Sequence, residues 1–139
     1  MSVYIAGPVV RQKSSIPRWV VSLYDDLMQL RSMGIIETRY PHPDRFLDDL
    51  GPKDFAAGIM RRIREADNVV AAFLPGDPSV PVETAMASFF GKRVLLVHNE
   101  ASNLPRVLTG LRLVTVRRWE PDMPRRIMEF VKREYPGPR

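Results

Sequence analysis

Two carboxylates and a serine lie close together near the middle of the chain, and these residue types suit acid–base or nucleophilic chemistry. The loop 75–81 contains Asp77 and Ser79, and Glu83 follows two residues after the loop. A carboxylate can act as a nucleophile, and a second one nearby can deliver a proton if burial favours its neutral form. An ordinary polar loop before a helix contains the same residue types, so the surrounding elements decide between the two interpretations.

Hydrophobic runs on both sides place this loop within a strand–loop–helix–strand unit. Residues 67–74 and 93–97 are apolar runs of strand length, which is typical of strands buried on both faces of a parallel sheet. The small residues between them predict a helix over 82–90 that Gly91 ends. Glu83 then falls in the first helical turn, where the helix dipole and unpaired N–H groups stabilise a carboxylate as the anion. A helix-start acid with no further role has the same signature.

A second polar loop follows the first strand of the chain. Residues 2–6 predict a short apolar strand, and the turn residues Gly7 and Pro8 end it. Gly7 lets the backbone turn sharply or approach a ligand closely, because it has no β-carbon. The loop beyond carries Arg11 and Ser14 and leads into a helix start, which suits an anion such as a phosphate.

The remaining pattern predicts an alternating α/β fold. Helices are expected from Pro17 to Gly34, with Ser15 as a cap, over 54–66 and over 121–135, with a helical turn at 103–110 and strands at 35–40 and 111–116. This alternation with short connections indicates a flavodoxin-like, Rossmann-like three-layer sandwich around a five-stranded parallel sheet of order 2-1-3-4-5. We expect a single domain over 1–139, with 136–139 as a loose tail.

The predicted strand order brings the loops after strands 1 and 3 together, and ligands bind at such a switch point. Tyr4, near the end of strand 1, either reaches this crevice with its hydroxyl or packs as a core tyrosine. We expect the substrate to contact residues of the loops and strand ends around the crevice. These are Gly7, Pro8, Arg11, Ser14, Ser79 and His98.

Helical spacing predicts which faces of the later helices are buried. In the helix over 54–66, Phe55, Ile59 and Ile63 should face the core. Arginines at 61, 62 and 64 should face away from it. In the last helix, the residues expected to face inward are Met123, Ile127, Phe130 and Val131.

Composition excludes several classes of protein. The chain has 139 residues, no cysteine and a formal net charge of +5. Acidic and basic residues are equal in number up to residue 100, so the whole excess of positive charge lies after it. Disulfides and thiolate chemistry are therefore absent, and no run approaches the roughly 20 apolar residues of a membrane span. Because no signal-peptide pattern opens the chain, we expect a cytoplasmic protein with neither a membrane nor a nucleic acid as partner. The two histidines lie far apart, so no metal site is expected.

Three motifs, in this order, resemble those of nucleoside 2-deoxyribosyltransferases and their nucleotide N-glycosidase relatives. They are Tyr4-Ile5-Ala6-Gly7-Pro8, Ala66-Asp67-Asn68-Val69-Val70, and Glu83-Thr84-Ala85-Met86-Ala87 followed by Gly91-Lys92. The resemblance implies a flavodoxin-like fold and cleavage of the N-glycosidic bond of a (deoxy)nucleoside or nucleoside 5′-monophosphate, with release or transfer of the base. It also implies that no cofactor is needed and that the protein forms a homodimer or higher homo-oligomer in which a neighbouring subunit completes the site.

The resemblance also implies roles for three residues. By position, Glu83 is the nucleophile that forms a covalent glycosyl-enzyme, and Tyr4 is the tyrosine that orients it. Asp77 falls where the transferases carry an aspartate that contacts the base. These three residues form the predicted catalytic set.

Two departures from the family pattern keep a rival interpretation open. Thr84 and Ala85 stand where the family usually has glycine, and the acid that the hydrolases carry in the preceding helix falls near Ile59 here. A non-catalytic nucleotide-binding or sensing module of the same fold would tolerate both departures. The combination of Tyr4, Asp77 and Glu83 favours the enzyme, because a binding module has no use for a nucleophile.

Overall fold

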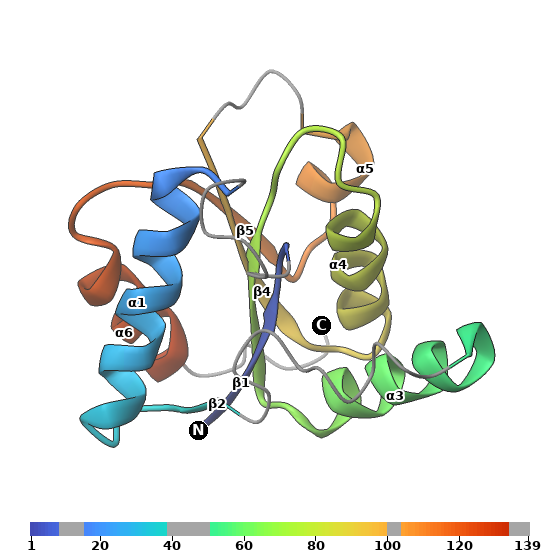
Figure 1. Cartoon of the computed structure of the whole chain (residues 1–139), viewed down its shortest axis with the longest axis horizontal. Coiled ribbons are helices and arrows are strands. Elements are labelled where there is room, and N and C mark those ends of the chain that lie inside the picture. The colour runs from blue at the N-terminus through green and yellow to red at the C-terminus, as the bar shows by residue number, and fades with distance from the viewer. Residues whose placement is uncertain (9–15, 39–50, 100–103, 134–139) are drawn as a thin grey trace.

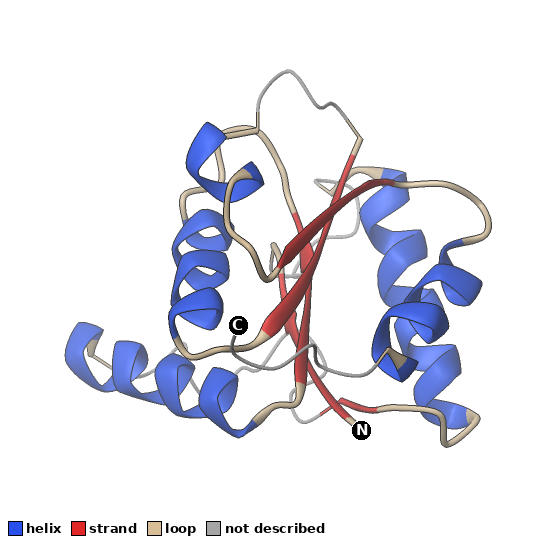
Figure 2. Ribbon diagram, turned by 180° about the vertical axis from the view of Figure 1, so that it is seen from behind, coloured by secondary structure: helices blue, strands red, loops and turns tan. Residues whose placement is uncertain are grey.

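The computed structural model describes residues 1–8, 16–38, 51–99 and 104–133. Five parallel strands form one sheet in the order β2-β1-β3-β4-β5, which confirms the predicted fold class and strand order. The strands are β1 (Ser2–Ala6), β2 (Glu37–Thr38), β3 (Asn68–Ala72), β4 (Arg93–His98) and β5 (Val114–Arg118). Figure 1 shows the sheet between two groups of helices, and Figure 2 shows the same layers from behind.

Helices cover both faces of the sheet, which explains why its central strands are apolar. On one face lie α1 (Arg18–Ser32) and α6 (Met123–Lys132), and on the other lie α3 (Pro52–Glu65), α4 (Ser79–Phe89) and α5 (Arg106–Thr109) (Figure 1). Every residue of β1, β3 and β4 is buried. Because side chains alternate along a strand, Val3 and Ile5 join the core under α1 and α6, while Tyr4 and Ala6 join the other core.

Helix α1 ends where predicted and buries one apolar face. The buried residues that recur along this face include Trp19, Leu23, Leu27 and Leu30. Pro17 directly precedes the helix instead of lying in its first turn, and the predicted cap Ser15 lies outside the described residues. Gly34 and Gly91 end α1 and α4 with φ of 74° and 75°, a conformation that glycine adopts without strain.

The helix α4 begins three residues earlier than predicted, at Ser79 instead of Val82. The Asp77 Oδ1 atom accepts a 2.9 Å hydrogen bond from the Ser79 N–H, which fixes the chain where the helix begins. Pro81 is tolerated because it lies in the first turn, where its missing N–H has no helical partner. Glu83 is therefore the fifth residue of the helix, one turn beyond the predicted position.

Two side chains of α3 are placed differently from the prediction. Ile59 and Ile63 are buried as expected, but Phe55 is 41% exposed and Arg62 is only 5% exposed. In Figure 1 the N-terminal half of α3, the half that contains Phe55, projects away from the sheet. Arg62 lies in the C-terminal half of the helix, which packs against the domain.

The other elements differ from their predictions only in extent. The described part of the second predicted strand forms β2 over two residues, and β5 starts at Val114 because a turn from the Val114 N–H to the Leu111 carbonyl occupies 111–113. The inward-facing residues predicted for α6 are all buried. The predicted tail at 136–139 lies outside the described residues. Within the described ranges, no helix is long and apolar enough to cross a membrane, and no group of three potential metal ligands occurs.

Candidate functional site

A short hydrogen bond joins strand β1 to helix α4. The Tyr4 hydroxyl donates to Glu83 Oε1 at 2.6 Å. Tyr4 points from β1 towards the face of the sheet on which α4 packs, and α4 lies against β1, β3 and β4. The two side chains meet because strand alternation turns Tyr4 to this face and α4 crosses over it.

The carboxyl group of Glu83 is held in a largely apolar setting. Burial raises its pKa from 4.5 to about 7, the hydrogen bond from Tyr4 lowers it, and the negative charge of Asp77 raises it. This corrects the expectation that the helix start stabilises Glu83 as the anion. As the fifth helical residue, Glu83 lies beyond the unpaired N–H groups of the first turn, and burial dominates. A carboxyl group with a pKa near 7 exists in both its protonated and its ionised form at neutral pH, which is typical of catalytic residues.

Asp77 lies in the loop before α4, as predicted, whereas Ser79 is the first residue of the helix. Gly76, with φ of 84°, turns the chain after β3, and Asp77 then accepts the hydrogen bond from the Ser79 N–H. Asp77 is half-buried and lies near enough to Glu83 for its charge to raise the pKa of Glu83. One carboxylate therefore has two effects: it organises the helix start and disfavours ionisation of its neighbour.

Tyr24 of α1 completes this cluster, and the sequence did not indicate it. Its hydroxyl donates to the Pro8 carbonyl at 3.1 Å. Burial raises the pKa of Tyr24 above its ordinary value, and the charges of Asp77 and Glu83 raise it further. Helical spacing of Val20, Tyr24 and Leu27 is a sequence signal for the burial of Tyr24, but it does not point to the site.

The structure shows a packing reason for glycine at position 7, which was not among the predicted reasons. Its φ is not positive, so no special turn requires glycine. A Cβ at Gly7 would collide with the Tyr24 hydroxyl and would lie 3.1 Å from Tyr24 Cζ and 3.3 Å from Ala72 Cβ. The missing side chain at Gly7 therefore makes room for Tyr24 at the end of β1.

An apolar pocket of about 350 Å³ opens beside Glu83, between α3 and α4. The residues that line it are Phe55, Ala56, Ile59, Pro78, Ser79, Val82, Glu83 and Met86. Its size lies within the usual range of roughly 300–1,000 Å³ for small-molecule sites. Phe55, predicted as a core residue, instead offers a partly exposed aromatic ring next to a carboxyl group.

The other predicted site residues are placed as follows. His98 is buried at the carboxyl end of β4, on the α4 side of the sheet, and its Nδ1 atom has no hydrogen-bond partner within the described ranges. Burial and the charge of Arg118 lower the pKa of His98. Tyr4 pairs with Val69 and Val69 with Val94, so His98 lies two strands and four residues away from Tyr4.

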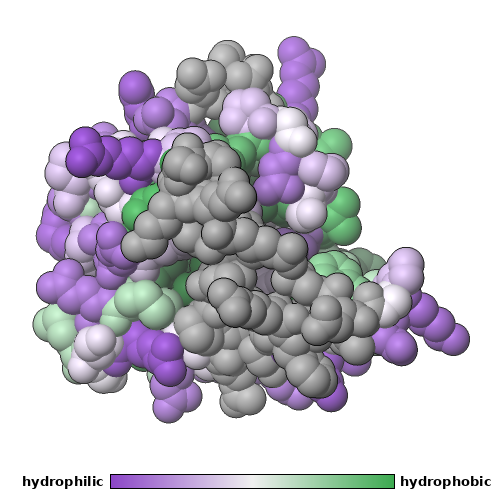
Figure 3. Space-filling model, in the orientation of Figure 1, coloured by the Kyte–Doolittle hydropathy of each residue, from purple (hydrophilic) through white to green (hydrophobic). Residues whose placement is uncertain are grey.

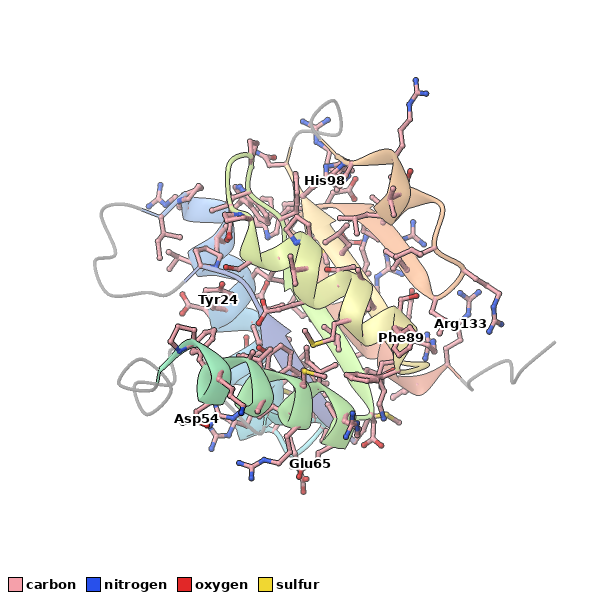
Figure 4. The ribbon with its side chains drawn as sticks, turned by 90° about the vertical axis from the view of Figure 1, so that its right-hand side faces the viewer. Tyr24, Asp54, Glu65, Phe89, His98 and Arg133 are labelled. Atoms are coloured by element: carbon pink, nitrogen blue, oxygen red, sulfur yellow. The ribbon has the colours of Figure 1, made fainter. Side chains whose placement is uncertain are left out.

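At about 3.3 Å per residue and 4.8 Å per strand, this separation amounts to roughly 16 Å between the Cα atoms. Figure 4 labels His98 and Tyr24, and these two residues lie well apart in it. His98 is therefore not part of the Tyr4–Glu83 cluster. Arg11 and Ser14 lie outside the described residues.

Several solved structures have the same fold. The CMP N-glycosidase BcmB of Clostridium botulinum matches with a TM-score of 0.63 at 16% identity, over 94% of this chain and 97% of that chain. BlsM matches with a TM-score of 0.63 at 24% identity, over 99% and 97% of the two chains. The 2-deoxyribosyltransferase of Bacillus psychrosaccharolyticus matches with a TM-score of 0.56 at 16% identity, over 80% and 82%.

These matches establish a common fold. No protein-family model matches the sequence, and no curated protein matches it. The resemblance noted in the sequence is therefore confirmed at the level of the fold, because both predicted enzyme types occur among the structural neighbours.

Proposed function

We propose that this protein cleaves the N-glycosidic bond of a nucleoside or nucleoside 5′-monophosphate and releases or transfers the base. The fold shared with a CMP N-glycosidase and a 2-deoxyribosyltransferase supports this class of reaction. The observation that carries the assignment is the 2.6 Å hydrogen bond between Tyr4 and Glu83 at the edge of an apolar pocket. A buried glutamate whose carboxyl group is held in place by a tyrosine hydroxyl is suited to act as an oriented nucleophile.

The reaction proceeds in two displacements. In the first, an oxygen of ionised Glu83 bonds to C1′ of the sugar while the C1′–N bond breaks and its electron pair leaves with the base. Tyr4 holds Oε1, so Oε2 is presented to the sugar. In the second, the oxygen of water or the nitrogen of another base attacks C1′, and the bond to Glu83 breaks.

Protons must balance in both steps. The leaving base takes up a proton, for which Asp77 in its protonated form is the proposed donor, because the effect of its charge on the pKa of Glu83 shows that the two carboxyl groups lie close together. In the second step Asp77 accepts the proton that the attacking water or base loses. The enzyme thus returns to its starting protonation state.

The pocket between α3 and α4 is the proposed site of the base. Its walls are apolar, and the Phe55 ring is free to stack on a planar heterocycle. The 5′-phosphate, if present, is assigned to Arg11 and Ser14 after β1 and to Ser79 at the first position of α4, because a helix N-terminus and an arginine both favour an anion.

A second copy of the chain is the proposed protein partner. Val82 and Phe89 on α4 and Val107 on α5 are exposed, Phe89 by 86%. Figure 3 shows hydrophobic side chains on the side of the molecule formed by α4 and α5. A partner on this surface would lie next to the pocket of Glu83. Light scattering on the wild type and on Phe89→Asp tests this, since Phe89→Asp should shift the protein to the monomer.

Incubation with a panel of nucleosides and their 5′-monophosphates, followed by chromatography of free bases, tests the proposed function. We expect one class of substrate to release its base with the wild type and not with Glu83→Ala. Glu37→Ala is the matched control, because it removes an exposed carboxylate at the opposite end of the sheet. Comparing a nucleoside with its monophosphate on wild type and on Arg11→Ala then decides whether the phosphate is recognised.

The alternative function is a nucleotide-binding module without turnover. The buried Thr84, at the position where the resembling family usually has glycine, favours it. Calorimetric binding of a nucleotide with no base release after prolonged incubation would support this alternative and contradict the enzyme.

A further inference from the structure

A second pocket, of about 190 Å³, lies on the opposite face of the sheet from Glu83. Leu95 of β4 and Phe130 of α6 contribute apolar surface, and both belong to the core under α1 and α6. Three arginines also line it: Arg117 of β5 and Arg126 and Arg133 at α6.

The charges around this pocket do not cancel among the described residues. Arg126 is paired with Glu120 at 2.8 Å and with Asp122 at 2.9 Å. Glu129, the acidic residue of the lining, is paired with Arg125 at 3.0 Å.

Arg117 and Arg133 are the arginines of the pocket with no carboxylate within 4.0 Å in the described part of the chain. Their charges are therefore available to an anion from solution.

Arg93 adds a buried positive charge beside them. It is buried, its guanidinium lies 4.3 Å from the centre of the Phe130 ring, and it donates a 2.8 Å hydrogen bond to the Arg133 carbonyl. Burial lowers the pKa of Arg93, and the positive charge of Arg133 lowers it further. The positive charges of Arg93 and Arg133 thus repel each other, and an anion bound by Arg133, which lines the pocket, would reduce that repulsion.

We propose that this pocket is a second, separate binding site for the phosphate group of a small phosphomonoester. Arg117 and Arg133 supply guanidinium N–H donors in the planar arrangement that suits phosphate oxygens, and the Thr115 hydroxyl lies in the same lining. Leu95 and Phe130 take up the apolar part of the ester. The volume equals that of about six waters of roughly 30 Å³ each, which accommodates a phosphate with a small body.

The site does not depend on the proposed reaction. It shares no lining residue with the pocket of Glu83, and the sheet separates the two. Its loss and the loss of base release are therefore independent measurements.

Titration calorimetry on the full chain at constant ionic strength tests the proposal, with inorganic phosphate, phenyl phosphate and uncharged phenol as probes. We expect phenyl phosphate to bind more tightly than phosphate, and phenol not to bind. The double substitution Arg117→Gln and Arg133→Gln should weaken phenyl phosphate binding at least tenfold. These side chains have no ion-pair partner among the described residues, so the fold should persist, and the melting temperature checks this.

The matched control is the double substitution Arg31→Gln and Arg61→Gln, which removes the same charge from exposed positions on α1 and α3. An equal loss of affinity in this control would show non-specific attraction and overturn the proposal. Glu83→Ala should bind phenyl phosphate as the wild type does, and a loss there would place the ligand in the other pocket. Glu129→Gln should tighten binding by removing a negative charge from the lining, and unchanged or weaker binding would contradict the assignment.

Discussion

The Tyr4 hydroxyl and the Glu83 carboxyl group, 79 residues apart in the chain, meet at 2.6 Å. The hydrogen bond and the burial of Glu83 shift its pKa in opposite directions, because the hydrogen bond favours the ionised form while the apolar surroundings disfavour it. The result is a carboxyl group with a pKa of about 7, which is ionised in about half of the molecules at neutral pH. The predictions on Glu83 and Tyr4 follow from this balance.

Glu83→Gln should lower the rate of base release at least about 1,000-fold, because the amide cannot form the glycosyl ester. The amide oxygen still accepts the hydrogen bond from Tyr4, so the fold should be retained. Rates of base release and circular dichroism of the variant measure both effects. Turnover at the wild-type level in folded Glu83→Gln would exclude Glu83 as the nucleophile.

Stability should depend on pH through Glu83. Its pKa is raised from 4.5 to about 7 in the folded state, so the folded protein binds this proton more tightly than the unfolded chain does. The resulting stabilisation is complete below pH 4.5 and is lost as pH rises to about 7, by roughly 3 kcal/mol at most.

Urea unfolding of wild type and Glu83→Gln between pH 4 and pH 8 isolates this effect, because all other groups titrate equally in the two proteins. We expect Glu83→Gln to be the more stable protein at pH 8, and the difference to vanish near pH 4. A difference that does not change with pH would show that burial leaves the pKa of Glu83 at its ordinary value.

Activity should follow the opposite trend. The nucleophile must be ionised, so kcat/KM should rise with pH through about 7. Tyr4→Phe removes the hydrogen bond that lowers the pKa of Glu83, so this rise should move to higher pH and the maximal rate should fall by tens to hundreds of fold. A pH–rate profile measures both. If Tyr4→Phe loses stability but keeps its rate and profile, Tyr4 is a packing residue only.

Gly7 and Tyr24 should be coupled in stability. Gly7→Ala introduces a Cβ that collides with the Tyr24 hydroxyl, which should cost about 1–3 kcal/mol of unfolding free energy. In Tyr24→Phe this hydroxyl is absent, so the same substitution should cost less. A double-mutant cycle by urea unfolding measures the coupling, and additive effects would show that the β1 exit relaxes around the new methyl group.

Phe55→Ala should raise KM for the substrate by about 5–150-fold, since stacking of a base on an aromatic ring contributes roughly 1–3 kcal/mol. The melting temperature should change little, because Phe55 is partly exposed. Met60→Ala is the matched control on the same helix, as Met60 is also partly exposed and does not line the pocket. Equal KM values for the two variants would show that the base does not bind against Phe55.

The sequence by itself determined the architecture and the outline of the site. Apolar runs of strand length, bounded by glycine and proline, specify the parallel sheet, and the order of its strands places the loops after β1 and β3 together. Local rules of this kind depend on neighbouring residues alone, and they placed Tyr4 near the end of β1 and Asp77 and Glu83 around the start of α4. The proposed catalytic roles of these three residues came from the resemblance to the transferase and glycosidase family.

Only the tertiary structure decided the electrostatics and the walls of the site. The pKa of Glu83, the approach of Tyr24 to Gly7 and the exposure of Phe55 each arise from elements that are distant in the chain. The earlier start of α4 is different, because it accompanies a local hydrogen bond from the Ser79 N–H to Asp77 that the pattern of small residues did not indicate. The burial of a side chain depends on the packing of the whole domain, so it cannot be derived from a local stretch of sequence.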